Sequence, residues 1–227
     1  MKRVNFFVFI LLMLLCSNIN ISAQKLTLQK GLSYIPFSKM PYQKRNLPGG
    51  RTNGCLVNIY NGIEGKMYED LQCKQYNSAK NNLDFTPEVY LKIQLSNGLY
   101  LGALSFSGCT EYRTDVMFIS DANGNVKDTL ECCVLNGDLA VKQYEVKSSE
   151  EIIIYRMFFA SSVPMKWENY SYSAKPLEGY IRKTIYRISS QNKFEKVSEQ
   201  TTTSNSFTSQ LLKKHNLWEP ESFKMSY

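Results

Sequence analysis

Apolar and polar residues alternate through most of the stretch 89–159, and Gly-containing turns interrupt the alternation at intervals. Alternation with a period of two is typical of half-buried strands, and tight turns between such runs are typical of hairpins. The stretch therefore predicts an antiparallel meander. Its last run, 150–159, is apolar on both faces and contains three consecutive isoleucines, which favours a strand covered on both sides. A short buried helix is the alternative.

The Asn97-Gly98 dipeptide predicts the register of the first hairpin. Asn-Gly favours a two-residue type I′ turn, because both central residues need a positive φ. In that register Ser96 lies opposite Leu99, and each strand position follows from this pair. One face of the hairpin then carries the predicted core residues Val89, Leu91, Ile93, Leu95, Tyr100, Leu104 and Phe106.

The remaining pattern adds further strands and a terminal helix. Hairpin turns are expected at 121–125, 136–138 and 190–192, and a strand at 55–60; a short helix is expected within 65–82. We interpret 26–53 as an early strand at most followed by a loop, 160–179 as a long loop, and 201–206 as a linker. A helix near 206–219 would dock through Leu211, Leu212, Leu217 and Trp218. The prediction is an all-β fold of eight or nine mainly antiparallel strands, as a barrel, a sandwich or part of a propeller, with one or two short helices.

The first 23 residues have the features of a secretory signal peptide. Lys2 and Arg3 precede an apolar run at 4–15, and the small-residue site ends at Ala23. The run is too short to span a bilayer, which takes about 20 apolar residues. Leu15 before Cys16 does not resemble a lipobox, so we expect cleavage near Ala23 instead of a lipid anchor at Cys16. The expected mature chain, 24–227, has the size of one domain. The Ala-Gln junction and the richness in Lys, Asn and Ile resemble the style of exported Bacteroidota proteins.

The charge balance is moderately basic. The formal net charge is +7, and loss of Lys2 and Arg3 with the signal leaves +5. This excess could favour an acidic partner or the anionic envelope surface, but no Lys/Arg cluster stands out from a surface of mixed charge. No nucleic-acid motif is present, so we expect no nucleic-acid partner. The expected mature chain has no transmembrane segment, and its oligomeric state stays open.

Five cysteines remain after the expected cleavage, in a compartment where disulfides persist. Two of them are adjacent on a predicted strand and should point to opposite faces. We expect Cys109 to pair with one of these two, and a second disulfide between the remaining early cysteines. The disulfide candidates are Cys55, Cys73, Cys109, Cys132 and Cys133.

The residues needed for common enzymes are sparse. The single histidine, His215, lies in the predicted terminal helix, so a nucleophilic Cys133 or a Ser/His/Asp arrangement would depend on that residue. One histidine also excludes multi-His zinc sites. A glycosidase needs two acids, for which Glu111, Asp115, Glu131 and Glu168 are present, but nothing singles out a pair. No cofactor is expected.

The turn at 121–125 offers oxygen ligands at alternate positions: Asp121, Asn123, Asn125 and Asp128. The segment resembles the opening of calcium loops of the D-x-[DN]-x-[DN]-G kind. Val126 stands in place of the turn glycine, and Cys132 stands where an EF-hand has its bidentate Glu. Asn and Asp are also common in hairpin turns for their own reasons. We therefore expect no metal site here.

The long loop after residue 159 carries the binding candidates Trp167, Tyr170 and Tyr172. Such long loops are uncommon in compact domains unless they are functional or disordered. Trp and Tyr provide a large rigid contact area with a polar tip. We expect a non-catalytic binding module of the cell envelope, periplasmic or secreted, that recognises a protein or a glycan. The alternatives are a periplasmic inhibitor or immunity-type protein that neutralises a toxin or hydrolase, and a hydrolase dependent on carboxylates or Cys133.

Overall fold

The computed structural model describes residues 27–45, 55–56, 88–107, 113–135, 141–160 and 176–227. Its elements are α2 (Leu28–Tyr34), β1 (Tyr42–Arg45), β2 (Cys55–Leu56), β3 (Glu88–Gln94), β4 (Tyr100–Ser107), β5 (Arg113–Ser120), β6 (Val126–Leu135), β7 (Val141–Ser148), β8 (Glu151–Phe159), β9 (Leu177–Ile188), β10 (Phe194–Thr201), β11 (Asn205–Phe207), α6 (Ser209–Lys214) and the 3₁₀ helix η1 (Pro220–Phe223). The predicted all-β class with short helices is confirmed. In these ranges no helix is long and apolar enough to cross a bilayer.

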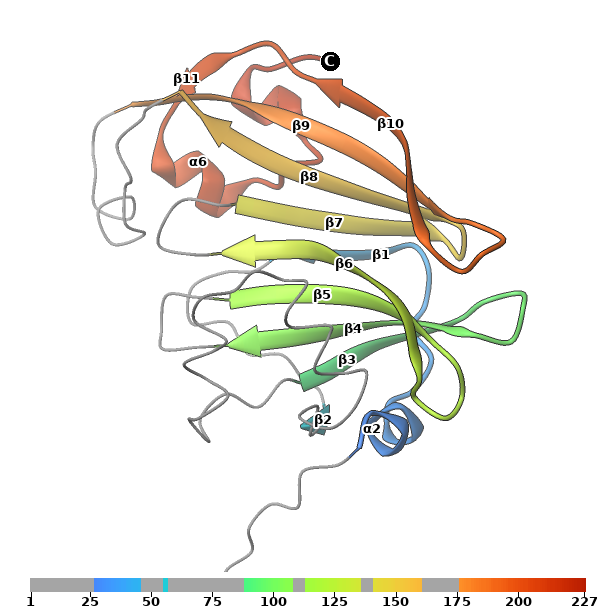
Figure 1. Ribbon diagram of the computed structural model, residues 1–227. Coiled ribbons are helices and arrows are strands. Elements are labelled where there is room, and N and C mark those ends of the chain that lie inside the picture. The colour runs from blue at the N-terminus through green and yellow to red at the C-terminus, as the bar shows by residue number, and fades with distance from the viewer. Residues whose placement is uncertain (1–26, 46–54, 57–87, 108–112, 136–140, 161–175) are drawn as a thin grey trace, which may run out of the picture.

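The strands form one antiparallel path in the order β10-β9-β8-β7-β6-β5-β4-β3-β2. Within the described ranges, β6 and β7 are joined by a single residue pair, Leu135 with Val141. β1 pairs with β7 over the residues beyond that pair, from Tyr42 with Val146 to Arg45 with Gln143. The path therefore has two halves: β2–β6 with α2, and β7–β11 with α6, the lower and upper halves of Figure 1.

The two halves bury a shared apolar cluster, which we call the inner cluster; the sheet face that carries it is the inner face. Its buried members come from β3 to β8: Leu91, Ile93, Leu95, Leu101, Ala103, Met117, Ile119, Cys132, Tyr144, Val146, Ile152 and Ile154. Tyr186, Ile188 and Phe194 of the β9–β10 hairpin pack against it. The sheet thus curls around its own core.

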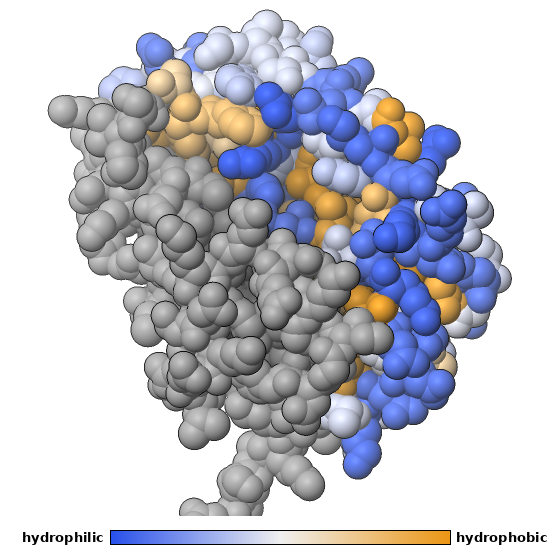
Figure 2. All heavy atoms as spheres, viewed as in Figure 1, coloured by the Kyte–Doolittle hydropathy of each residue, from blue (hydrophilic) through white to orange (hydrophobic). Residues whose placement is uncertain are grey.

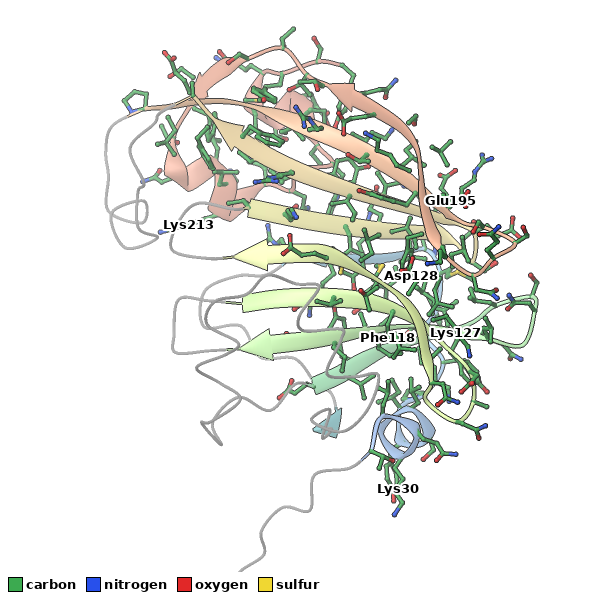
Figure 3. All side chains as sticks on the ribbon, viewed as in Figure 1. Lys30, Phe118, Lys127, Asp128, Glu195 and Lys213 are labelled. Atoms are coloured by element: carbon green, nitrogen blue, oxygen red, sulfur yellow. The ribbon has the colours of Figure 1, made fainter. Side chains whose placement is uncertain are left out.

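Hydrogen bonds between distant hairpins hold this curl at one end. Asn97 Nδ2, in the β3–β4 turn, donates to Asn192 Oδ1 in the β9–β10 turn at 2.7 Å. The backbone N–H of Phe194 donates to Asp128 Oδ2 at 2.8 Å, and Figure 3 shows Asp128 on β6 next to the start of β10. These bonds join the two halves where their hairpin tips meet.

A second core lies on the opposite face of β7–β9. The C-terminal residues Phe207, Leu212, Leu217, Phe223 and Met225 cover it and pack on β-strand residues that include Val141, Ile153, Tyr155, Met157, Leu177 and Ile181. Leu212 and Leu217 are buried, and Leu211 and Trp218 are partly buried against the same cluster. The predicted docking residues pack on this core, but the helix is shorter than the predicted 206–219: α6 ends at Lys214, and Leu217 and Trp218 lie between it and η1. β8 is a strand that is buried on both faces from Ile152 to Tyr155, which confirms the prediction of a strand over the helix alternative.

The predicted register of the first hairpin is wrong by one position. Gln94 pairs with Tyr100, and the N–H of Leu95 donates to the Leu99 carbonyl at 2.9 Å, so the loop has three residues. Gly98 alone in this loop has a positive φ, 81°, whereas a type I′ turn would require one at Asn97 too. Asn97 Oδ1 instead accepts the N–H of Leu99 at 3.1 Å, which stabilises the longer loop.

The shifted register changes which β4 residues reach the inner cluster. Leu101 and Ala103 lie opposite Ile93 and Leu91 and belong to the inner cluster, in place of the predicted Tyr100 and Leu104. A register irregularity between Val89 and Leu91 then places Val89 opposite Leu104, and both are buried outside that cluster. An added Cβ at Gly102 would lie 2.2 Å from Phe118 Cζ, so any larger residue there would have to displace the fully buried Phe118 ring.

The N-terminal segment 27–45 contains a helix that the pattern did not predict. Thr27 caps α2, because its Oγ1 accepts the N–H of Lys30 at 3.3 Å, and Leu28 and Leu32 are buried. Lys92 Nζ on β3 donates to the Leu32 carbonyl at 2.8 Å, which ties α2 to the sheet. Two other boundaries differ: β11 falls partly in the predicted linker, and β9 begins at Leu177, inside the predicted loop. The helix expected within 65–82 lies outside the described residues.

Candidate functional site

A row of three cationic residues crosses the inner face of the upper half. In the antiparallel register, Lys142 on β7 lies opposite Arg156 on β8, and Arg156 lies opposite Arg182 on β9. The same side of β8 carries Ile152 and Ile154, so the row continues the inner face beyond the apolar cluster. Like charges directly opposite each other on a sheet are destabilising. The repulsion among these three charges therefore has to be offset by other interactions.

Two aromatic side chains form the next row. Phe158 lies opposite Tyr180, and their rings stack with centroids 5.1 Å apart and an interplanar angle of 11°. The guanidinium carbons of Arg156 and Arg182 lie 4.6 Å and 4.4 Å from the centroid of the Phe158 ring. Such cation–π contacts hold a guanidinium in place while its N–H edges stay available to an anion. We call Lys142, Arg156, Phe158, Tyr180 and Arg182 the cation–aromatic surface.

Two of the three cations have carboxylate partners. Lys142 forms an ion pair with Glu131, and Arg182 Nε lies 3.6 Å from Glu199 Oε1. Arg156 is exposed, and among the described residues it has no ion pair. The centre of the row is thus a cation that faces two other cations and whose charge no described carboxylate balances.

The β8–β9 ladder fixes the positions of these side chains. It runs without a register shift from Glu151 opposite Arg187 to Phe159 opposite Gly179. An added Cβ at Gly179 would lie 2.2 Å from the Phe158 carbonyl oxygen, so glycine allows the two strands to approach beside Tyr180. The N–H of Ala160 donates to the Glu178 carbonyl at 2.8 Å and closes the ladder. The aromatic pair therefore has a rigid backbone support.

A buried polar group lies at the border between the apolar and cationic parts of the inner face. The Tyr90 hydroxyl donates to Asp115 Oδ2 at 2.8 Å and lies 2.9 Å from the Tyr144 hydroxyl. Since Tyr90 has one hydroxyl proton and gives it to Asp115, Tyr144 donates to Tyr90. Burial, assisted by nearby Asp115, raises the pKa of Tyr90 and Tyr144 well above 10.0, so both phenols stay protonated. Asp115, a candidate glycosidase acid, is fully buried in this group.

Glu145, on the other face of β7, is also enclosed. It is 2% exposed and accepts hydrogen bonds from Tyr155 at 2.6 Å, from Lys147 at 3.1 Å and from Gln43 of β1. Burial acts to raise its pKa, but these hydrogen bonds outweigh burial and lower the pKa below the ordinary 4.5. The carboxylate is thus a stabilising link between β1, β7 and β8.

The segment 121–125, which resembles the opening of a calcium loop, is a hydrogen-bonded turn. Asp121 Oδ1 accepts the N–H groups of Asn123 and Asn125 at 2.9 and 3.0 Å, and Oδ2 accepts Asn125 Nδ2 at 2.8 Å. Partial burial acts to raise the pKa of Asp121, but these bonds lower it. Asp128 is turned toward Phe194. In the part of the chain that the structure describes, no three His, Cys, Asp or Glu residues gather as a metal site would require.

The cysteine predictions are tested at one position. Cys132 is fully buried, its Sγ donates to the Asp115 carbonyl at 3.3 Å, and it forms no disulfide. The predicted pairing of Cys109 with either Cys132 or Cys133 therefore fails for Cys132 and stays a prediction for Cys133. The register shift opposite Cys132 turns it into the inner cluster beside Leu130. Cys73 and Cys109 lie outside the described residues, and for Cys55 and Cys133 the structure describes the backbone alone.

The other sequence candidates are scattered. His215 is the residue after α6, and its Nδ1 lies 3.8 Å from Glu219 on the same segment. Glu131 is paired with Lys142, on a different strand from buried Asp115. Glu111, Glu168 and the binding candidates Trp167, Tyr170 and Tyr172 lie outside the described residues. In the sequence, Trp167, Tyr170 and Tyr172 lie between Ala160 and Pro176, and thus between Phe158 and Tyr180.

The sequence analysis did not identify the cation–aromatic surface. The sequence does contain the pattern that indicates this surface: Arg156 and Phe158 occupy alternate positions on one strand, and Tyr180 and Arg182 occupy alternate positions on the next. Recognising it required the pairing of β8 with β9, which the long intervening segment hides. Comparison with known proteins finds no match to a family model, to a curated protein or to a solved structure, so the functional argument rests on these residues.

Proposed function

We propose that the mature chain is an exported, non-catalytic binding module of the bacterial cell envelope, which recognises a protein or a glycan through the cation–aromatic surface and the loop that follows β8. The observation that carries this proposal is the exposed Arg156 between Lys142 and Arg182 on a rigid ladder. Like charges kept at neighbouring positions cost stability. Binding of an anionic ligand would neutralise these charges and offset that cost.

The polar groups elsewhere in the described residues support a binding role over a hydrolytic one. The Asp115 carboxylate is fully buried beside Tyr90 and does not reach solvent. The Glu145 carboxylate is enclosed by three hydrogen-bond donors. Both tie strands together. Arg and Tyr, in contrast, are the residue types enriched where proteins contact ligands and partners.

The test compares capture of envelope components by the mature chain and by two matched variants. The double variant Trp167→Ala/Tyr170→Ala removes the loop aromatics, and Arg156→Ala removes the central cation. We expect each to fold as the wild type does and to capture the main partner about tenfold less well, since hydrogen bonds to charged groups contribute about 1.5 kcal/mol or more.

The control is Arg187→Ala, which removes the same charge from an exposed position on β9, at the opposite end of the β8–β9 ladder from Phe158. Capture by this variant should equal that of the wild type. Thermal unfolding followed by circular dichroism verifies that all variants are folded. Equal capture by all four proteins would refute the proposed function.

A further inference from the structure

We propose that the ligand of the cation–aromatic surface is an acidic glycan, a polysaccharide chain whose carboxylate or sulfate groups follow the row Lys142, Arg156 and Arg182. This inference rests on the proposed function and names the class of ligand. It is carried by three features of the row: its charge, its spacing and its lack of an apolar anchor.

The charge of the row selects an anion. Arg156 has two cationic cross-strand neighbours and no ion pair in the described residues. The two guanidinium groups share one aromatic support, Phe158, so their N–H edges are held close to each other. Guanidinium forks bind carboxylate, sulfate and phosphate oxygens through parallel hydrogen bonds. The site is therefore organised for oxyanions before any ligand arrives.

The spacing of the row suits a linear polyanion. Neighbouring strands lie about 4.8 Å apart, so three cations in register on β7, β8 and β9 form a line perpendicular to the strands. A chain of acidic sugars presents its charged groups at a regular repeat along such a line. At the two ends, Glu131 and Glu199 neutralise Lys142 and Arg182 while the site is empty. The ligand exchanges with these carboxylates and binds Arg156 without competition.

The apolar residues argue against a protein segment. Protein partners are usually anchored by an aromatic or aliphatic side chain that enters a pocket between exposed apolar residues. The large hydrophobic side chains that are exposed in the described ranges are Tyr34, Phe37, Met40, Val197 and Tyr227, and none belongs to this surface. Phe158 and Tyr180 stack on each other. On the visible face, Figure 2 shows hydrophilic residues over much of the coloured part, with separate hydrophobic areas among them.

The experiment measures binding of the mature chain to immobilised polysaccharides at low salt and at about 0.15 M, where surface charges are screened beyond about 8 Å. The probes are polygalacturonate, which carries carboxylates, dextran sulfate, which carries sulfates, and neutral dextran. Polyglutamate is the acidic polypeptide probe. Arg156→Ala is compared with Arg187→Ala, because both remove one exposed arginine and leave the net charge equal.

We expect binding to polygalacturonate or to dextran sulfate and none to neutral dextran. Arg156→Ala should weaken the binding about tenfold, and Arg187→Ala less than about twofold. Preference between the two acidic polysaccharides assigns the carboxylate or the sulfate. These results support the proposal only if polyglutamate binds more weakly than the preferred polysaccharide.

Three results would overturn the proposal: no binding to either acidic polysaccharide, equal losses in the two arginine variants, or polyglutamate binding as tight as that of the polysaccharides. If capture of envelope components still depends on Arg156 in any of these cases, the glycan assignment fails while the proposed binding function stands. If capture does not depend on Arg156 or on the loop aromatics, the binding function itself fails.

Discussion

The inner face of β7–β9 has two ends that differ in chemistry although the same strands form them. At one end Ile152, Ile154 and Val146 are buried against the β3–β6 half, and the β9–β10 hairpin packs on them. At the other end, Lys142, Arg156 and Arg182 lie opposite one another on the same face of the three strands. Arg156, for example, is the next residue after Ile154 on this face of β8. Neighbouring hairpins cover the apolar end and bond to each other across it, whereas Arg156 is exposed to solvent.

The difference separates a part of the sheet that stabilises the fold from a part that we propose binds a ligand. Apolar area removed from water stabilises the fold by about 25 cal/mol per Å², so the apolar end supplies folding free energy. The cationic end supplies little, since exposed charges contribute about 0–1 kcal/mol each and like charges repel. Four substitutions, taken from the largest expected effect to the smallest, test this division.

The largest effect is expected for Ile154→Ala at the apolar end. Ile154 is 6% exposed within the inner cluster, and truncation of a buried isoleucine leaves a cavity. The free energy of unfolding should fall by about 3 kcal/mol. Urea denaturation with a fixed m-value measures it. A loss below about 1 kcal/mol would mean that the apolar end is not the source of stability that we infer.

The second effect concerns Glu145, which lies on the other face of β7. Glu145→Gln should reduce the free energy of unfolding at neutral pH by about 2 kcal/mol, because hydrogen bonds to the charged carboxylate are weakened. Burial opposes ionisation, but the bonds from Tyr155, Gln43 and Lys147 lower the folded-state pKa. A lowered pKa gives stability that is fully present above the unfolded-state value.

That contribution is lost as the pH falls from about 4.5 through the lowered folded-state pKa. Urea denaturation between pH 7 and pH 3 should therefore show a smaller acid-induced loss for Glu145→Gln than for the wild type. An identical pH dependence of the two proteins would show that this carboxylate is not hydrogen-bonded as described.

The third effect concerns the end of the sheet at which hydrogen bonds between hairpins hold the two halves together. Asp128→Ala leaves the N–H of Phe194 without its 2.8 Å acceptor and should reduce the free energy of unfolding by about 1 kcal/mol. Asp128→Asn is the control, because the amide oxygen can still accept. Hydrogen exchange of the Phe194 amide should accelerate in the alanine variant and change less in the asparagine variant. Equal exchange in both would exclude a role for Asp128 in closing the curl.

The smallest effect is expected for Arg156→Ala, two residues from Ile154 on the same face of β8. Because Arg156 is exposed and faces like charges, its removal should change the free energy of unfolding by less than about 0.5 kcal/mol. The measurement is urea denaturation beside Ile154→Ala. A loss comparable with that of Ile154→Ala would erase the distinction between the two ends.

The sequence predicted the fold class because alternation reports which strand faces are buried. It located most strands between 89 and 159 and the docking residues of the terminal helix, including Leu212 and Leu217. The predicted register of the first hairpin was wrong, because Asn97-Gly98 permits both a two-residue and a three-residue loop. The Asn97 side chain favours the longer loop. The sequence pattern also did not predict α2, whose seven residues are too few for a clear helical period.

The candidate site was less predictable than the fold. Arg156 and Arg182 are 26 residues apart in the chain and become neighbours through the register of β8 with β9. Cys132 and Asp115 could be named as candidates, but a register irregularity decides that the thiol is buried beside the Asp115 carbonyl. Local pattern cannot supply such long-range pairings, since they depend on loops whose length gives no unique register.

The position of β1 has a consequence for how the protein is made. The side-chain bond from Gln43 to Glu145 joins residues 102 positions apart, and β1 supplies β7 with the neighbour that β6 does not provide there. Contacts of such sequence separation form slowly, because a long stretch of chain must be ordered before they are gained. β1 is synthesised before β7 and therefore has no partner strand until the chain has grown past β7, and a synthetic peptide with the sequence of β1 could then compete for the edge of β7.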